Sequence, residues 1–296
     1  MARDSNKNRY LNRLRLAKAG LLAGLLGVLS GAAHAAWQLN LQEPVTATAK
    51  RVYDLHTLLT WVIFAIFAGV FTVVAYSLVF HRRSKGHKAA DFHDNTTVEL
   101  AWTIVPALIL IGIAFPATSA LVNMRDTSQP DLTVKVTGYQ WKWGYEYLTG
   151  DAAGVKFMSV LSTPRDQIEN KAPKGEHYLL EVDHPLVVPV GKKVRILTTA
   201  TDVIHNWSVP AFAVKTDAVP GFLRDTWFRA DKEGTYRGQC SELCGKDHGF
   251  MPVVVEVVSE EKYAAWVSDQ KQQMAAAADD PNKIWKLDEL VARGEK

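Results

Sequence analysis

Two uncharged apolar stretches constrain the fold of this 296-residue chain more than any other feature. Residues 55–80 and 100–122 contain no Asp, Glu, Lys or Arg, and each exceeds the roughly 20 apolar residues that a helix needs to cross a bilayer. A buried helical hairpin of a soluble protein is the alternative, but these lengths favour two transmembrane helices. The second span contains Pro106 and Pro116, which are tolerated where neighbouring helices satisfy the freed carbonyl groups. We therefore expect this span to pack against another subunit.

The charges around these spans indicate their orientation. The connecting loop is basic in residues 81–88, and an excess of Lys and Arg marks the cytoplasmic side. Upstream, a basic segment and the short apolar run 19–29 precede Ala33-His34-Ala35, the pattern of a secretory signal cleaved after Ala35. A non-cleaved anchor is the alternative, but the run is short for a bilayer span. The N-terminus and everything after residue 124 are then outside the cytoplasm.

The net charge gives no reason to expect a nucleic-acid partner. The whole chain has a formal charge of +3, and the leader alone contributes +5, so the mature chain is at −2. A mildly acidic surface suits a basic protein partner rather than nucleic acid.

The composition changes at about residue 131 to short β-rich runs separated by Gly and Pro. Such runs at short intervals predict a Greek-key sandwich or barrel, and they lie at residues 132–136, 178–182, 194–199 and 253–258. The charged end of the chain has no evident function. The sequence therefore predicts five segments: a signal peptide (1–35), an extracytoplasmic segment (36–53), a transmembrane hairpin (54–124), a β-domain (125–267) and a charged C-terminal tail (268–296).

The only two cysteines lie in the run CSELCGKDHGFM, residues 240–251. Cys240, Cys244, His248 and Met251 form a set of soft ligands that suits copper better than magnesium or calcium. His205 follows a β-rich run and supplies a second imidazole. A disulfide is plausible in an exported protein, but it explains neither the imidazoles nor the thioether, and zinc does not require a thioether. The pattern therefore favours copper.

Together with three further stretches, this run resembles subunit II of the bacterial haem-copper cytochrome c oxidases. The further stretches are GYQWKWGYEY at 138–147, KTDAVPG at 215–221, and Glu99 with Trp102 in the second apolar span. The resemblance covers roughly residues 50–267. It implies an α+β membrane protein in which a two-helix hairpin precedes an all-β, cupredoxin-like Greek-key domain. It also implies a location in the bacterial inner membrane, with the C-terminal domain in the periplasm.

The resemblance implies a dinuclear CuA centre with two copper ions. The thiolates of Cys240 and Cys244 would bridge the metals, and His205 and His248 would each bind one. Met251 would be a weak ligand, and Glu242 would contribute its backbone carbonyl. The carboxylate of Glu242 would also bind a magnesium or manganese ion shared with subunit I, since such ions prefer oxygen ligands.

The implied activity is that of a cytochrome c oxidase subunit. It accepts electrons from cytochrome c and passes them to the haem-copper subunit I, which reduces oxygen to water and pumps protons. Subunit III and membrane lipid are further implied partners. Trp141 would be the electron entry residue, although a strand residue packing the core is the alternative. The docking face would include the acidic residues Glu146, Asp183 and Asp202, each of which is otherwise a solvated surface charge.

Glu99 has two interpretations. A carboxylate at the start of a helix is stabilised by the helix dipole, and Asn95 nearby offers a capping group. The resemblance instead implies the entrance of a proton path into subunit I, consistent with the functional importance of carboxylates in membrane segments.

Other functions remain as alternatives. A quinol oxidase subunit of the same fold lacks the copper ligands, whereas a membrane-tethered copper-binding or copper-delivery protein would need exposed, exchangeable ones. A nitrous oxide reductase has a similar copper loop without the hairpin. A covalently bound haem c requires C-x-x-C-H, which is absent from this sequence. We therefore expect the electron donor to be a separate cytochrome c.

Overall fold

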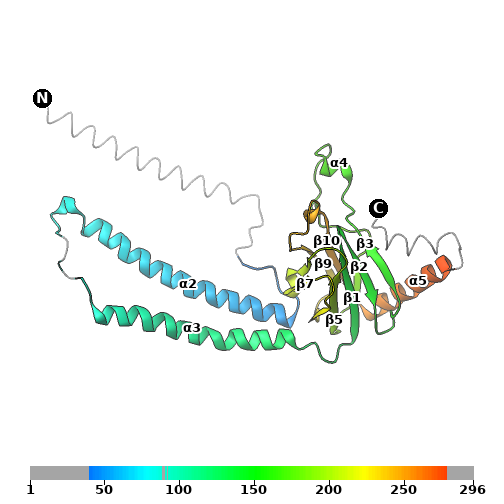
Figure 1. Cartoon of the computed structure of the whole chain (residues 1–296), viewed down its shortest axis with the longest axis horizontal. Coiled ribbons are helices and arrows are strands. Elements are labelled where there is room, and N and C mark those ends of the chain that lie inside the picture. Colours follow the sequence, from blue (N-terminus) through cyan, green and yellow to red (C-terminus); the bar gives the residue numbers. More distant parts are fainter. Residues whose placement is uncertain (1–39, 89–90, 92, 279–296) are drawn as a thin grey trace. The chain divides into compact units, whose positions relative to one another are not determined.

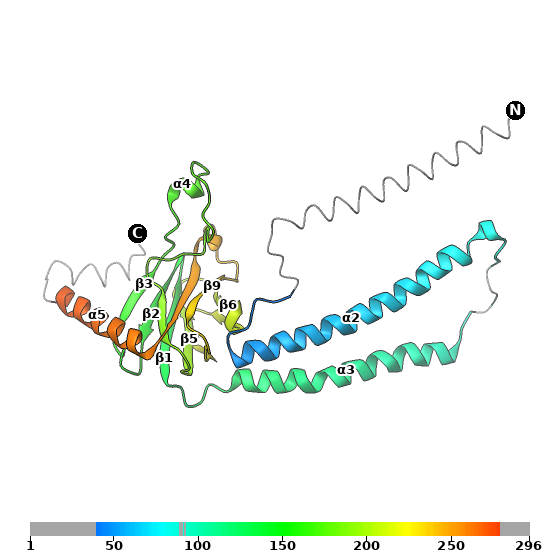
Figure 2. The ribbon, with the colours of Figure 1, turned by 180° about the vertical axis from the view of Figure 1, so that it is seen from behind.

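The computed structural model describes residues 40–88, 91 and 93–278. The expected signal peptide at 1–35 and the end of the C-terminal tail lie outside these residues. In chain order, the described part consists of a helical hairpin, two five-stranded sheets and a C-terminal helix (Figures 1 and 2).

The hairpin consists of α2 (Ala47–Phe80) and α3 (Thr96–Arg125), joined by a loop that contains the short helix η1 (Arg83–Lys85). Each long helix begins at a capping side chain: Thr46 accepts a hydrogen bond from the backbone N–H of residue 49, and Asn95 accepts one from residue 98. Both helices are long and apolar enough to cross a membrane, as the sequence predicts. At 34 residues and about 1.5 Å per residue, α2 is roughly 50 Å long and extends beyond the apolar span.

The β-domain consists of two five-stranded sheets. The first contains, in spatial order, β3 (Lys156–Ser159), β2 (Lys142–Tyr147), β1 (Leu132–Tyr139), β5 (Val194–Ala200) and β8 (Arg224–Phe228). The second contains β4 (Leu186–Pro189), β10 (Pro252–Val258), β9 (Gly234–Cys240), β6 (His205–Val209) and β7 (Val214–Ala218). The pairs β1–β5 and β4–β10 are parallel, and the other pairs are antiparallel. The predicted all-β domain is confirmed.

Alternate residues of β2 form part of the core between the sheets. Trp143, Tyr145 and Tyr147 are almost completely buried, so these three aromatic residues are structural. Their polar atoms find partners: the indole N–H of Trp207 on β6 donates to the Tyr145 hydroxyl at 3.3 Å, and the Tyr147 hydroxyl donates to the Val187 carbonyl at 2.7 Å. Buried aromatic side chains of this kind contribute much of the stability of a sandwich.

The C-terminal helix α5 (Glu260–Ala278) packs on the β-domain. Tyr263 and Val267 are buried, and the ring of Trp266 lies 5.3 Å from that of Tyr147, centroid to centroid. The helix therefore runs across the boundary that the sequence suggested between residues 267 and 268. The remaining helices of the described residues are one turn each: α4 (Arg165–Ile168), η2 (Pro210–Phe212) and η3 (His248–Phe250).

One predicted strand was wrong. Residues 178–182 form a turn and an isolated bridge from Val182 to Leu161 rather than a strand. Leu179 has a left-handed backbone with φ of 61°, and its N–H donates to the Thr163 hydroxyl at 3.1 Å. This local hydrogen bonding replaces a sheet ladder.

Candidate metal centre

The predicted ligands come together because β6 and β9 are neighbours in the second sheet. His205 is the first residue of β6, and Cys240 is the last residue of β9. The two strands pair in antiparallel register with Trp207 opposite Cys240, so His205 lies close to this cysteine. The chain then loops through residues 241–251 before β10, and this loop carries the second cysteine, the second histidine and the methionine.

The ligand atoms form a connected cluster around the two sulfur atoms. Cys240 Sγ lies 3.8 Å from Cys244 Sγ, 4.0 Å from His205 Nδ1 and 3.4 Å from the Glu242 carbonyl oxygen. Cys244 Sγ lies 3.4 Å from His248 Nδ1 and 3.5 Å from Met251 Sδ. The structure therefore brings together all six residues that were predicted as copper ligands.

The chemistry of this cluster fits a soft metal. Both cysteines are free thiols, buried at the end of the sandwich, rather than a disulfide. His205, Cys240 and Cys244 place their ligand atoms within 4.8 Å of one another, a grouping able to hold a metal ion. Three sulfur atoms and two imidazole nitrogens suit copper, whereas calcium and magnesium prefer oxygen.

The thiols differ in acidity. Burial raises the pKa of the Cys240 thiol, but hydrogen bonds from His205 and from backbone groups outweigh it and bring that pKa down to about 7. Burial and the neighbouring Cys240 sulfur raise the pKa of the Cys244 thiol to about 12. Cys240 therefore ionises first. A metal cation would supply the positive charge that the second thiolate needs.

Asp202 fixes the orientation of the His205 ring. Its Oδ1 lies 2.8 Å from His205 Nε2, which leaves Nδ1 facing the sulfur of Cys240. Burial lowers the pKa of His205, but the hydrogen bonds to Cys240 and Asp202 outweigh it and raise that pKa overall. From sequence, Asp202 was predicted only as part of a docking face and this contact was missed, although its spacing of three residues from the histidine was a possible signal.

Two glycines allow the centre to close. A Cβ atom on Gly138 would lie 2.7 Å from His205 Cδ2, so any larger residue there would displace the imidazole. Gly245 has φ of +119°, and a Cβ there would lie 3.0 Å from the Gln140 amide nitrogen. Gly245 therefore combines a backbone that favours glycine with a close contact to another segment.

Trp141 is half-buried in the turn between β1 and β2 and contacts the metal loop directly. Its indole Nε1 donates a hydrogen bond to the Cys244 carbonyl oxygen at 3.2 Å. Gln140, which was not among the candidates predicted from sequence, donates its amide Nε2 to the same oxygen at 2.9 Å. Both side chains thus reach a ligand residue that is 103 or 104 positions away in the sequence.

Glu242, Glu146 and Asp183 are the remaining candidate residues of the β-domain. The Glu242 side chain is exposed. Glu146 forms a solvent-exposed ion pair with Lys135 at 3.6 Å, and Asp183 accepts hydrogen bonds from the backbone N–H groups of residues 160 and 184 at 2.8 and 2.7 Å. Both acids therefore have local partners in addition to solvent.

Glu99 belongs to the first turn of α3, far along the chain from the metal loop. Its Oε1 accepts a weak hydrogen bond from the backbone N–H of Asn95 at 3.4 Å. This contact involves one carboxylate oxygen and supports the interpretation as a helix-start residue.

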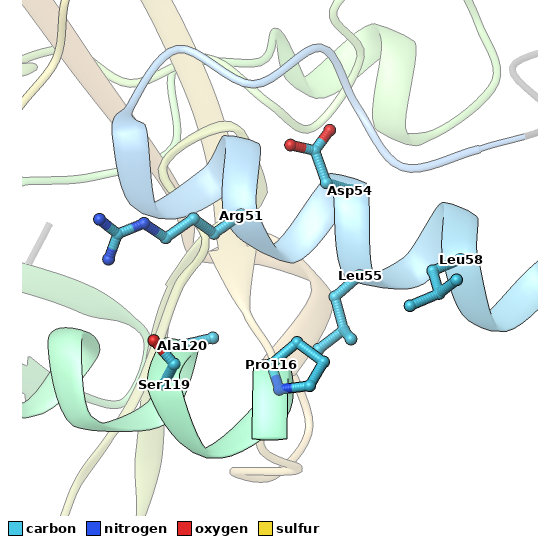
Figure 3. A pocket seen from close by; sticks show the side chains of 7 residues that line it. All are labelled: Arg51, Asp54, Leu55, Leu58, Pro116, Ser119 and Ala120. Carbon is cyan, nitrogen blue, oxygen red and sulfur yellow. The ribbon is translucent and has the colours of Figure 1, made fainter. Parts of the chain in front are cut away.

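A separate hollow of about 370 Å³ lies between α2 and α3. Figure 3 shows Leu55 and Pro116 facing each other across it, whereas the carboxylate of Asp54 points away. Its lining contains no candidate metal ligand, so it is distinct from the centre described above.

A helical hairpin of membrane-spanning length, followed by a β-sandwich with thiols, imidazoles and a thioether grouped at one end, defines a membrane protein with a cupredoxin-like domain and a candidate metal site. The model of the family "Cytochrome C oxidase subunit II, periplasmic domain" matches residues 132–258, and the transmembrane-domain model of the same subunit matches residues 34–119. The chain belongs to the cytochrome c oxidase subunit II family.

Two relatives agree with this assignment over most of their length. Cytochrome c oxidase subunit 2 of Cereibacter sphaeroides is 38% identical over 277 residues, covering 85% of this chain and 91% of the relative. The corresponding subunit of Metridium senile is 40% identical over 78% of this chain and 89% of its own length. The crystal structure of the periplasmic domain of subunit II of cytochrome oxidase of Bradyrhizobium japonicum is 44% identical with a TM-score of 0.44, and covers 50% of this chain and 98% of that one.

Proposed function

We propose that this chain is the electron-accepting subunit of a cytochrome c oxidase, taking electrons from cytochrome c and passing them to a haem-copper subunit that reduces oxygen to water and pumps protons. The observation that carries the proposal is the buried cluster in which two free thiols 3.8 Å apart are flanked by two imidazoles and a thioether. Membership of the subunit II family supports it.

Cys240 and Cys244 would hold two copper ions together with His205, His248, Met251 and the backbone carbonyl of Glu242. The bound pair would supply a one-electron carrier whose charge is shared over both metals and both thiolates. The protein contributes a largely closed cage: His205 is completely buried, both cysteines are at most 5% exposed, and His248 is partly buried. Such closed ligands are unsuited to exchange with a partner, which disfavours the alternative of a copper-delivery protein.

The remaining residues have roles around this cage. Trp141 is the proposed entry point because its indole is partly exposed and also contacts the Cys244 carbonyl. The exposed carboxylate of Glu242 is the proposed ligand of a magnesium or manganese ion shared with subunit I. Residues 1–35 would be a signal peptide. The hairpin would anchor the chain in the bacterial inner membrane beside subunits I and III, with the β-domain in the periplasm.

Copper stoichiometry tests this function. The full-length chain, purified in detergent, reduced and supplied with copper, is expected to bind two copper ions and to turn purple. The electron-spin spectrum should show one unpaired electron shared by both metals, since Cys240 and Cys244 would hold both of them close together. One copper per chain, a colourless protein, or preferential binding of zinc would contradict the proposal.

Asp202 has two proposed roles, in the docking of cytochrome c and in the orientation of the His205 imidazole, and substitution can distinguish them. We expect Asp202→Asn to weaken association with a lysine-rich cytochrome c and to flatten its dependence on salt, because one steering charge is removed. The same change should alter the copper spectrum, since this carboxylate holds His205 Nε2. Asp183→Asn is the matched control, because it removes an equal charge without contacting a ligand. An unchanged salt profile in both variants would remove these acids from the docking face.

Glu99 is the proposed site of proton uptake, on the cytoplasmic side marked by the basic loop. In the assembled oxidase, Glu99→Gln is expected to slow oxygen consumption without slowing reduction of the metal centre. Glutamine retains an oxygen that accepts the hydrogen bond from Asn95 but cannot carry a proton at neutral pH. Asp94→Asn, an exposed carboxylate just before the helix, is the control. Parental turnover in Glu99→Gln would leave Glu99 a helix-start residue only.

A further inference from the structure

Gln140 contacts both halves of the metal centre. Its backbone N–H donates to Asp202 Oδ2 at 2.7 Å, and the other oxygen of this carboxylate lies 2.8 Å from His205 Nε2. Its side-chain amide donates to the Cys244 carbonyl oxygen at 2.9 Å. A single residue in the β1–β2 turn thus connects the histidine on β6 with the cysteine loop after β9.

The metal loop packs closely against this turn. The Cys244 carbonyl accepts from Gln140 and from the Trp141 indole, and the next residue, Gly245, approaches both side chains so closely that a Cβ would lie 3.0 to 3.1 Å from them. The Sγ atom of Cys244 also contacts His248 Nδ1 and Met251 Sδ. Movement of its backbone would therefore separate this sulfur from the other two ligand atoms.

The two contacts of Gln140 differ in how substitution affects them. The contact with Asp202 uses a backbone N–H, which any residue except proline retains. The contact with Cys244 uses the side-chain amide, which only a side chain of the same length with a donor can replace. Substitutions at this position therefore remove one of the two hydrogen bonds to the Cys244 carbonyl and leave the backbone contact with Asp202 in place.

We propose that Gln140 is a positioning residue of the metal centre: its side-chain amide holds the Cys244 carbonyl, keeps the loop 241–251 closed, and maintains the contact between Trp141 and this loop. The proposal rests on the proposed function in taking residues of this loop as metal ligands. The hold on the loop itself, however, is a property of the metal-free chain and can be measured without copper.

Thiol reactivity of the metal-free, full-length chain provides the first test. In Gln140→Met the side chain keeps its length but loses the donor, and in Gln140→Asn the amide is one methylene too short to reach. We expect the two buried thiols, which lie 3.8 Å apart, to react with iodoacetamide roughly fivefold faster in both variants, as the loss of one partly exposed hydrogen bond implies. If Gln140 served only to fill space, Met would behave like the parent and Asn would not. Parental rates in both variants would overturn the proposal.

Copper loading provides the second readout. Both variants are expected to release copper to a chelator roughly fivefold faster than the parent and to show shifted absorption bands, because the Cys244 carbonyl keeps only the hydrogen bond from Trp141. Gln167→Met is the matched control, since Gln167 lies on α4 and its amide oxygen accepts only a hydrogen bond of its own segment, from Gly175 at 3.2 Å. A parent that binds no copper would contradict the proposed function, whereas unchanged thiol rates in the variants would contradict the role of Gln140.

Discussion

The full-length Cys244→Ser chain is expected to bind at most one copper ion and to lose the purple colour. Cys244 Sγ contacts the other cysteine, His248 Nδ1 and Met251 Sδ, so its removal disconnects two further ligands from Cys240 and His205. A serine oxygen is a hard ligand and a poor bridge between copper ions. Copper analysis and the visible spectrum of the purified chain measure the change.

Met251→Leu is the control for this loss. The thioether lies 3.5 Å from Cys244 Sγ and is 2% exposed, and leucine fills a similar volume. We expect both copper ions to remain bound with a shifted reduction potential, because a weak ligand tunes a copper centre more than it retains the metal. A purple, two-copper Cys244→Ser chain would show that this thiol is not a bridge. Loss of both metals in Met251→Leu would instead show a strong thioether ligand.

The ligand set was predictable because most of it is local in sequence. Cys240, Cys244, His248 and Met251 lie within one loop, and thiol, imidazole and thioether groups at this density are typical of a soft-metal site. The hairpin was predictable for a similar reason, since its two uncharged stretches are as long as a helix must be to cross a bilayer. His205 was the only ligand that needed a long-range assumption, and the pairing of β6 with β9 accounts for its position.

The supporting contacts were not predictable from sequence. Gln140 reaches Cys244 across 104 positions, and Gly138 matters only because the imidazole of His205 passes over it. Neither residue type signals such a role by itself. The parallel pairs β1–β5 and β4–β10 are also invisible to local pattern, because register and direction depend on the whole topology. The failed strand at 178–182 shows the same limit, since a local turn competed with an apolar run.

Trp141→Phe is expected to slow electron transfer from cytochrome c to the copper centre by roughly tenfold or more, which corresponds to about 1.4 kcal/mol in the activation barrier. Phenylalanine lacks the N–H that donates to the Cys244 carbonyl at 3.2 Å, and its smaller ring makes less contact with the loop. Docking affinity should change little, because no charge is removed, and both copper ions should remain bound, because none of the proposed ligands is altered. Stopped-flow reduction of the assembled oxidase by cytochrome c measures the rate.

Trp227→Phe is the matched control for this substitution. Trp227 is also half-buried, and its indole N–H likewise donates to a backbone carbonyl, that of Asn123 at 3.3 Å, but this carbonyl belongs to α3 rather than to the metal loop. The two variants therefore lose the same group and a similar hydrogen bond. If Trp141 is the point of electron entry, only its variant slows reduction at a saturating concentration of cytochrome c. Equal rates in both variants and the parent would make Trp141 a packing residue of the β1–β2 turn.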